Sequence, residues 1–349
     1  MDLIELLSIG VERNASDIHL SVGIPPTYRI DGELISLVER KLTAEDTLYL
    51  VKQALDETRL KKLDETGEID FSYSLHKIGR FRVNAFKQRG SYAMVLRIIP
   101  LDIPLMDELG LPPVISELSK LPRGLILVTG PTGSGKTTTL ASIINKINSE
   151  RKCHIITLED PLEYLHKHKK SIVNQREIGS DTQSFSNGLR GALREDPDVI
   201  LVGEMRDLET ISIAITAAET GHLVLSTLHT NGAAKTIDRI VDVFPPYQQQ
   251  QIKVQLSSVI EGVISQQLLM KSSGVGRVAA HEVMLATPAI RNLIREGKNH
   301  QIDTSIQTSG ALRMQTMDAS LINLYKRGEI TKETAINQAY NMDEVRKKI

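Results

Sequence analysis

Residues 130–138 read Gly-Pro-Thr-Gly-Ser-Gly-Lys-Thr-Thr and match the pattern G-x-x-x-x-G-K-[ST] at every specified position. In such a loop the glycines let backbone N–H groups face phosphate oxygens, the lysine adds a positive charge, and the hydroxyl can bind Mg²⁺. The pattern therefore predicts a site for ATP and Mg²⁺, with Thr137 as a metal ligand. The predicted nucleotide-binding residues are Thr132, Gly133, Ser134, Gly135, Lys136, Thr137 and Thr138.

The residues around this loop predict the local fold. Residues 125–129 form a short apolar run that is typical of a buried strand. Apolar residues then recur at helical spacing, at Leu140, Ile143, Ile144 and Ile147. Strand, loop and helix thus follow one another in the order that a phosphate-binding loop requires.

Length and composition limit the remaining possibilities. The 349 residues suffice for about two domains, and 41% of them are hydrophobic, so a soluble globular protein is expected. Lysine and arginine total 42 against 43 acidic residues, which gives no overall positive field to attract nucleic acid. Cys153 is the single cysteine, so the sequence predicts a reducing cytoplasm, no disulfide and no Cys-x-x-Cys zinc site. The acidic start is unlike a signal peptide, and no apolar run reaches the roughly 18 residues of a membrane span, so any membrane role should be peripheral.

Residues 1–99 predict a small α/β domain with an antiparallel sheet. Short turn signals separate strand candidates at residues 68–75, 80–88 and 91–99. Asp31-Gly32 suits a tight hairpin turn between two further strands. A helix should begin at Thr43, which forms a capping-box pattern with Asp46, run past Leu60, and stop at Gly67.

Prolines recur between residues 100 and 122 and mark a linker. From residue 123 to 349, β-rich apolar runs alternate with helical stretches, the pattern of a mostly parallel sheet with helices on both faces. Its strand candidates are residues 125–129, 154–158, 198–202 and 223–227. The predicted fold class is therefore α/β, with a nucleotide-binding domain of residues 123–349 behind a smaller N-terminal domain.

Ligands bind at the carboxyl ends of strands in such a sheet, which decides between two acids around one strand. Asp198 and Glu204 lie six residues apart, about 20 Å in an extended strand, so only Glu204 can reach the phosphates. We expect Glu204 to be catalytic and to bind Mg²⁺, and Asp198 to be structural. Gly203 stands where many enzymes of this type carry an additional acid, so a second carboxylate is needed.

That second carboxylate should come from Glu159-Asp160-Pro161-Leu162-Glu163, which follows the strand at residues 154–158. We favour Glu163 as the group that orients or deprotonates the attacking water, because it projects beyond the strand. Glu159 or Asp160 could assist the metal, and the choice of the base among the three stays open.

Two histidines flank the strand at residues 223–227. His222 opens this strand, whereas His229 ends it and can contact a γ-phosphate. His229 is therefore the candidate for the site.

Together these segments resemble the type II and type IV secretion-pilus ATPase superfamily. Its Walker A, acidic, Walker B and histidine boxes match residues 130–138, 155–164, 198–204 and 220–229 in order and spacing. Residues 289–298, Ala-Ile-Arg-Asn-Leu-Ile-Arg-Glu-Gly-Lys, look like the C-terminal signature of the pilus retraction ATPases, the PilT family. The likeness covers nearly the whole chain and includes residues 15–20, 81–86 and 314–318.

The resemblance implies a PAS-like N-terminal domain, a RecA-like ATPase domain and a homohexameric ring that hydrolyses ATP to retract type IV pili. It implies nucleotide between the two domains, with Arg82 and Arg97 near the phosphates. Arg194 and Arg206 are candidate interface arginines that neutralise charge in the transition state. It also implies a cytoplasmic motor that docks peripherally on an inner-membrane pilus platform protein. Extension ATPases usually carry an extra N-terminal domain and a tetracysteine zinc insertion, and their absence favours retraction.

The signature segment itself predicts a capped helix. Thr287 is placed as N-cap, Pro288 in the first turn and Gly297 at the end. The family resemblance makes its polar face, with Arg291, Arg295 and Glu296, a surface that couples ring motion to the pilus. We expect both arginines to be exposed, so that replacing both with alanine costs little stability.

Four alternatives stay open. The chain could be an accessory retraction paralogue or a type II secretion ATPase with the same chemistry. A nucleic-acid motor is disfavoured by the neutral charge and the absence of tryptophan. A scaffold that binds ATP without hydrolysis is disfavoured because Lys136, Glu163 and Glu204 are all present.

Overall fold

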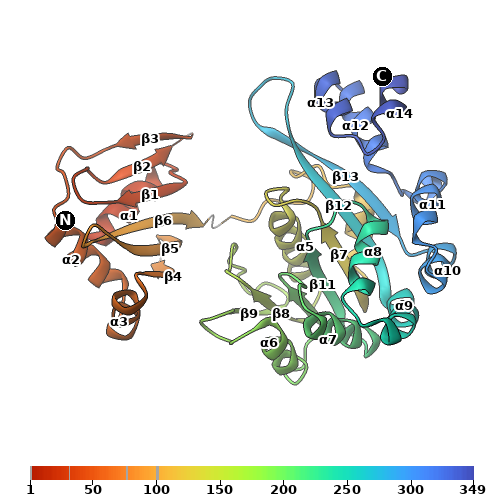
Figure 1. The fold of residues 1–349 in the computed structure, drawn as a ribbon, viewed down its shortest axis with the longest axis horizontal. Helices are drawn as coiled ribbons and strands as arrows, with labels where there is room; N and C mark the ends of the chain where they lie inside the picture. The colour runs from red at the N-terminus through yellow and green to blue at the C-terminus, as the bar shows by residue number, and fades with distance from the viewer. Residues whose placement is uncertain (1, 31, 76–77, 100–101) are drawn as a thin grey trace. The chain divides into compact units, whose positions relative to one another are not determined.

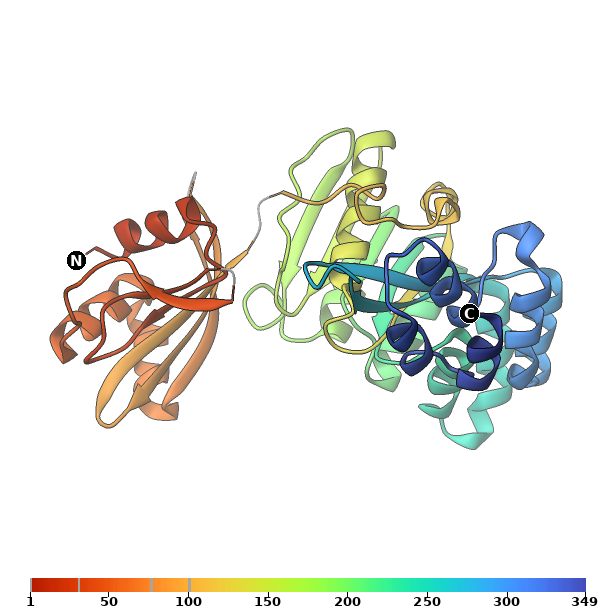
Figure 2. The same cartoon turned by 90° about the horizontal axis from the view of Figure 1, so that it is seen from above.

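The computed structural model describes residues 2–30, 32–75, 78–99 and 102–349. The chain divides into two compact units, each of which is described by itself. The first unit comprises residues 1–102 and 161–165, and the second comprises residues 103–160 and 166–349. Figures 1 and 2 show the strands and helices of each.

The first unit is a six-stranded antiparallel sheet in the order β3-β2-β1-β6-β5-β4. Its strands are β1 (Asp17–Leu20), β2 (Thr27–Ile30), β3 (Glu33–Ser36), β4 (Glu68–Leu75), β5 (Gly79–Gln88) and β6 (Ser91–Ile99), and its helices are α1 (Leu3–Glu12), α2 (Ala44–Ala54) and α3 (Glu57–Thr66). In β5 the buried side chains alternate with more exposed ones, because successive residues of a strand point to opposite faces. Phe81, Val83 and Ala85 thereby join the core that α1, α2 and α3 cover.

Two local predictions in this unit have different outcomes. β2 and β3 form the expected hairpin, with Gly32 at φ +88°, while Asp31 lies outside the described residues. The single helix expected from Thr43 to Gly67 is wrong, because the chain forms α2 and α3 instead. Leu55 is extended, and the Asp56 side chain accepts a hydrogen bond from the Arg59 N–H, which starts a new helix.

The second unit contains a seven-stranded sheet in the order β13-β12-β7-β11-β10-β8-β9. The strands are β7 (Gly124–Thr129), β8 (His154–Glu159), β9 (Ile172–Glu177), β10 (Val199–Val202), β11 (Leu223–Leu228), β12 (Ile260–Met270) and β13 (Arg277–Leu285). All neighbours pair in parallel except β12 with β13. The four predicted strands of this region are therefore confirmed as β7, β8, β10 and β11.

Helices cover both faces of this sheet, as the sequence pattern predicts. Leu125 and Leu127 of β7 face one core with α6 (Phe185–Ala192), α7 (Leu208–Glu219), α8 (Ala233–Asp242) and α9 (Pro246–Val259). Ile126 and Val128 of the same strand face a second core with α4 (Pro113–Leu118) and α5 (Lys136–Glu150). Strands buried on both faces explain why these segments read as continuous apolar runs.

The segment expected as a linker begins at Pro100, which with Leu101 lies outside the described residues. Further along it, α4 and Leu111 pack into the core of the second unit. The chain ends in a helical region made of α10 (Pro288–Glu296), η1 (Asn299–Gln301), α11 (Ile302–Thr308), η2 (Gly310–Leu312), α12 (Met317–Lys326), α13 (Lys332–Asn337) and α14 (Met342–Lys348). Among the helices described, none is both long and apolar enough to cross a membrane.

Candidate functional site

The carboxyl ends of four parallel strands bring the predicted residues of the second unit to one edge. The aligned pairs are Thr129 with Leu228, Ser226 with Val202, and Val202 with Leu158. The phosphate-binding loop after β7 and His229 after β11 therefore start at the same level. Glu204 follows the end of β10 and Glu159 is the last residue of β8 at this edge, while Asp198 lies at the opposite end of β10. There its carboxylate accepts a hydrogen bond from the His154 N–H at 2.8 Å, a structural role.

The phosphate-binding loop has the backbone that its sequence predicts. Gly130, Gly133 and Gly135 all have positive φ, at 142°, 79° and 86°. Lys136 is 8% exposed, and its ammonium donates hydrogen bonds to the carbonyls of Gly130 and Pro131, at 2.9 and 3.0 Å. The loop leads into the N-terminus of α5, where backbone N–H groups and the helix dipole favour an anion. A cavity of about 380 Å³ borders residues 131–134.

Glu204 lies among cationic and titratable side chains. Its Oε2 is 2.8 Å from Arg206 Nε and 3.5 Å from His229 Nε2. The Glu204 side chain is 18% exposed, whereas that of His229 is 43% exposed. The strand ends are tied together beside it, because Thr227 Oγ1 donates to the Gly203 carbonyl at 2.6 Å. The structure thus places Glu204 and His229 together, as the two strand-end predictions require.

The acids at the end of β8 and just after it have different surroundings. Glu159 is 7% exposed, and its Oε1 accepts hydrogen bonds from Thr157 and Gln175 at 2.7 and 3.2 Å. Asp160 and Glu163 are exposed, and Glu163 lies in residues 161–165, which group with the first unit. The Glu159 carboxylate is therefore buried and fixed by hydrogen bonds, whereas the Glu163 carboxylate is exposed.

Arg82 and Arg97 are direct neighbours on β5 and β6 of the first unit. Both are exposed, on the face of the sheet opposite its core. Arg97 Nε donates to Asp17 Oδ1 at 2.9 Å. Burial raises the pKa of Asp17, but hydrogen bonds from Arg97 and Ser16 outweigh this effect and hold it below its usual value. The charged Asp17 fixes Arg97 beside Arg82.

The two candidate interface arginines are both exposed in the isolated chain. Arg194 follows α6, and Arg206 follows β10. Arg206 pairs with Glu204 of the same chain, so it lies at the carboxyl edge of the sheet.

Helix α10 has the predicted caps and one unexpected side chain. Thr287 caps its start and Gly297 ends it at φ +70°. The expected exposure of Arg291 is wrong. Its guanidinium donates to three carbonyls and forms an ion pair, with Ala286, Ser257, Ser258 and Glu261 as partners at 2.9–3.1 Å. Ser257 and Ser258 belong to the last turn of α9, where helix carbonyls lack partners, and an arginine satisfies them well.

Arg295 and Glu296, by contrast, are exposed. Glu296 pairs with Lys298 on the surface. Of the three residues predicted to form the coupling surface, Arg295 and Glu296 therefore remain candidates, whereas Arg291 has a structural role.

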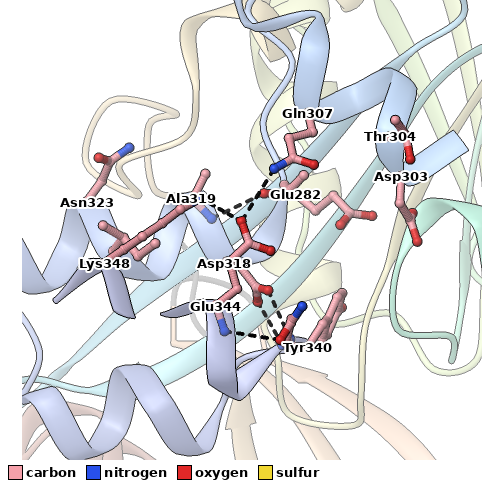
Figure 3. Close-up of a pocket in the computed structure, with 13 residues that line it drawn as sticks. Glu282, Asp303, Thr304, Gln307, Asp318, Ala319, Asn323, Tyr340, Glu344 and Lys348 are labelled. Carbon is pink, nitrogen blue, oxygen red and sulfur yellow. Dashed lines mark hydrogen bonds and ion pairs between the residues drawn. The ribbon is translucent and has the colours of Figure 1, made fainter. Parts of the chain in front are cut away.

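Sequence reasoning missed Glu282 on β13, which lines a cavity of about 470 Å³ among the C-terminal helices (Figure 3). Glu282 is 2% exposed and accepts hydrogen bonds from the N–H groups of Ala233 and Met317, at 2.7 and 3.4 Å. It thereby caps both α8, which follows the His229 loop, and α12. Burial raises the pKa of Glu282 to about 7. No local sequence pattern marks it, because its partners are 49 and 35 residues away.

In the same cavity, Asp318 accepts hydrogen bonds from the N–H groups of Tyr340 and Asn341, at 2.7 and 2.9 Å (Figure 3). Asp318 therefore joins α12 to the start of α14. Gln266 on β12 was also missed, and it contacts the phosphate-binding loop directly.

Comparison with known proteins identifies the family. The sequence model of the family "Type II/IV secretion system protein" matches residues 3–275. The chain is 51% identical to the type IV pilus retraction ATPase PilT of Pseudomonas aeruginosa, over 97% of this chain and 98% of that protein. The chain belongs to the PilT family of pilus retraction ATPases, within the type II/IV secretion proteins. The predicted family is therefore confirmed.

Two further comparisons refine this result. The chain is 40% identical to the type IV pilus ATPase PilU of Pseudomonas aeruginosa, over 99% of this chain and 91% of that protein. A crystal structure of the pilus retraction motor PilT with bound ADP superposes with a TM-score of 0.94, at 51% identity and 99% coverage of both chains. The α/β fold class with a RecA-like ATPase domain is thereby confirmed.

Proposed function

We propose that this chain is an ATP-hydrolysing motor that powers type IV pilus retraction and hence twitching motility. The observation that carries the proposal is the 51% identity to a retraction ATPase over nearly the whole of both chains. The complete phosphate-binding loop and the Glu204–His229 pair support the chemistry. The motor works as a homohexamer in the cytoplasm and docks peripherally on the inner-membrane platform protein of the pilus.

In this proposal, the N–H groups of residues 132–138 and the Lys136 ammonium bind the phosphates of ATP. Mg²⁺ neutralises charge on the β- and γ-phosphates when it is bound. Thr137 and Glu204 are the residues that would hold it, since hydroxyl and carboxylate oxygens are its preferred ligands. Glu204 lies at the correct strand end, and its carboxylate is only partly exposed.

Glu163 orients or deprotonates the attacking water, and His229 contacts the γ-phosphate. Glu159, with one oxygen held by Thr157 and Gln175, positions the strand end beside the reacting groups. Arg82 and Arg97 add positive charge at the phosphates. Arg194 and Arg206 act at the subunit interface of the ring, where a neighbouring subunit's phosphates would face them.

An accessory role beside a second retraction ATPase is the nearest alternative, because PilU is also a relative at 40% identity. The higher identity to PilT over a similar span favours the main motor. A type II secretion ATPase is the second alternative. A nucleic-acid motor is the third, and binding to single-stranded DNA that weakens with added salt would indicate it.

The test measures pilus retraction in cells that lack this chain, together with ATP hydrolysis by the purified protein. We expect piliated cells that neither retract nor twitch, and rescue by the wild-type chain. Lys136→Ala should not rescue, whereas Lys146→Ala, in a surface ion pair on the same helix, should. Normal retraction in the deleted strain would assign the accessory role, and loss of secretion with normal retraction would assign the type II role.

A further inference from the structure

We propose that Gln266 is a positioning residue for the nucleotide, because its side-chain amide fixes the orientation of the Ser134–Gly135 peptide in the phosphate-binding loop. This inference rests on the proposed ATPase function. It concerns a residue 132 positions away from the loop that it controls.

Strand β12 lies next to β7, and Ser265 pairs with Thr129 at the end of β7. Gln266 is therefore level with the first residue of the loop. Its side chain is 3% exposed, and both ends of the amide are used. Nε2 donates to the Ser134 carbonyl at 2.6 Å, and Oε1 accepts from Thr139 Oγ1 at 2.8 Å.

The bond to Ser134 determines where the next N–H points. In a trans peptide the C=O and the following N–H point in opposite directions. Since Gln266 holds the Ser134 carbonyl toward β12, the Gly135 N–H is turned away from β12. That N–H is one of the donors that the loop sequence assigns to phosphate oxygens.

Glycine makes this anchor necessary. Gly135 adopts φ +86° and ψ 18°, a conformation that glycine reaches and leaves at little cost. Without Gln266 the peptide could rotate and turn the Ser134 carbonyl toward the phosphates. An oxygen would then face an anion where a donor is required, which weakens nucleotide binding.

The backbone and the side chain of Gln266 also approach two glycines of the loop closely. A Cβ at Gly130 would lie 2.2 Å from the Gln266 carbonyl oxygen, and a Cβ at Gly135 would lie 2.9 Å from Gln266 Nε2. The motif glycines at these positions therefore serve the contact with β12 as well as the phosphates.

The neighbouring residue of β12 holds a second loop of the site. Ser265 Oγ accepts a hydrogen bond from the Gly232 N–H at 2.9 Å, three residues after His229. Ser265 and Gln266 point to opposite faces of the sheet, as successive strand residues do. One strand thus holds the phosphate-binding loop with one residue and the His229 loop with the next.

The test compares Gln266→Leu with Thr139→Val in the full-length protein. Gln266→Leu removes both hydrogen bonds at similar volume, whereas Thr139→Val removes only the bond to the helix. For Gln266→Leu we expect the Kd of a fluorescent ADP analogue with Mg²⁺ and the KM for ATP to rise about 10- to 100-fold, as for one lost bond to a charged group. The kcat should fall less than about 5-fold, and Thr139→Val should change Kd less than about 3-fold, since the carbonyl anchor is intact.

Gln266→Glu adds a readout that simple loss of packing would not produce. The buried carboxyl group can donate to the Ser134 carbonyl only when it is protonated. Nucleotide affinity of this variant, relative to wild type, should therefore improve as the pH falls from 8 to 6.

Wild-type Kd and KM in Gln266→Leu, or equal effects of Gln266→Leu and Thr139→Val, would overturn the inference. If Gln266→Leu does not fold, the pH dependence of Gln266→Glu decides: its presence supports peptide positioning, and a flat profile rejects it. Failure of the wild-type protein to bind the ADP analogue would instead reject the proposed function.

Discussion

Short sequence patterns singled out both the signature helix α10 and the carboxyl edge of the parallel strands, which we call the nucleotide edge. The patterns predict the side-chain positions better at the nucleotide edge than in α10. At the edge, the loop glycines, Lys136 and the strand-end acids occupy the places that the sequence predicts. In α10 the caps are as predicted, but Arg291 bonds to the end of α9, whereas an exposed coupling residue was expected. The difference shows which kinds of residue a sequence pattern can place.

Glycines and capping residues act on the backbone within a few positions of themselves, so their effect can be predicted from the local sequence. A long cation such as Arg291 finds its partners through the tertiary fold. Its guanidinium reaches carbonyls 33 and 34 residues away, at the end of another helix. The same helical wheel that predicts an exposed arginine also fits one that caps a neighbouring helix.

The largest test of this comparison is Lys136→Ala. Removing the buried ammonium that is proposed to bind the phosphates should abolish measurable ATP turnover, a loss of about 10³-fold or more. Steady-state phosphate release measures it, with Lys146→Ala on the same helix as the matched control. Hydrolysis near the wild-type rate would show that the local pattern has misplaced the site.

The next test separates the two acids of the acidic segment. Glu163→Gln should retain ATP while slowing hydrolysis by about 10²-fold, because the change removes the proposed water-activating carboxylate but keeps its shape. Glu159→Gln should have a smaller effect on kcat, since an amide oxygen can still accept from Thr157 and Gln175. Single-turnover kinetics and ATP binding measure both variants. A larger loss in Glu159→Gln would assign the water-activating role to the buried carboxylate.

The same contrast between local and long-range contacts separates what the sequence could predict from what it could not. The strands at residues 125–129, 154–158, 198–202 and 223–227 were predictable because burial on both faces leaves apolar runs. The break between α2 and α3 was not, because Leu55 and Leu60 continue a helical spacing across it while Asp56 caps a new helix. Gln266 and Glu282 were not predictable either, since each acts on backbone groups that only the folded sheet brings near.

The third test replaces Arg291 with alanine and sharpens the comparison within α10. The change leaves Glu261 and the last carbonyls of α9 without their donor, and it should lower the free energy of unfolding by about 3–4 kcal/mol. Arg295→Ala, an exposed substitution one turn later, should change it by less than about 0.5 kcal/mol. Urea unfolding followed by circular dichroism measures both. Equal, small changes in the free energy of unfolding for the two variants would contradict the structural role of Arg291 and indicate that both arginines are exposed surface residues.

Arg295→Ala also serves as the cleaner probe of coupling, because its fold and ATP turnover should be intact. Loss of twitching in that variant alone would support a contact with the pilus machinery.

The last test concerns Glu282, which connects the nucleotide edge with the C-terminal helices because it accepts hydrogen bonds from the first N–H groups of α8, behind the His229 loop, and of α12. Its pKa is about 7 in the folded chain against an ordinary value of 4.5, so the folded state binds the proton more tightly than the unfolded state. The resulting stabilisation is fully present below pH 4.5 and is lost as the pH rises to about 7. At 1.36 kcal/mol per pKa unit, the change is no more than about 3.5 kcal/mol.

Glu282→Gln cannot take up this proton, although its carbonyl can still accept from the Ala233 N–H. The difference in unfolding free energy between wild type and Glu282→Gln should therefore fall as the pH rises from 4.5 to 7 and stay constant above it. Urea unfolding at pH 5, 6, 7 and 8 measures this difference, while Asp303 and Asp318, the carboxylates that face Glu282, are unchanged in both proteins. Glu344→Gln, at the rim of the same cavity, is the matched control, and breaking its exposed pair with Lys348 should cost less than about 0.5 kcal/mol at every pH. A difference that is flat across this range, or that rises with pH, would mean that Glu282 is ionised throughout. In that case the two helix N-termini, rather than burial, would determine the charge of Glu282, a carboxylate that connects the nucleotide edge to the C-terminal helices.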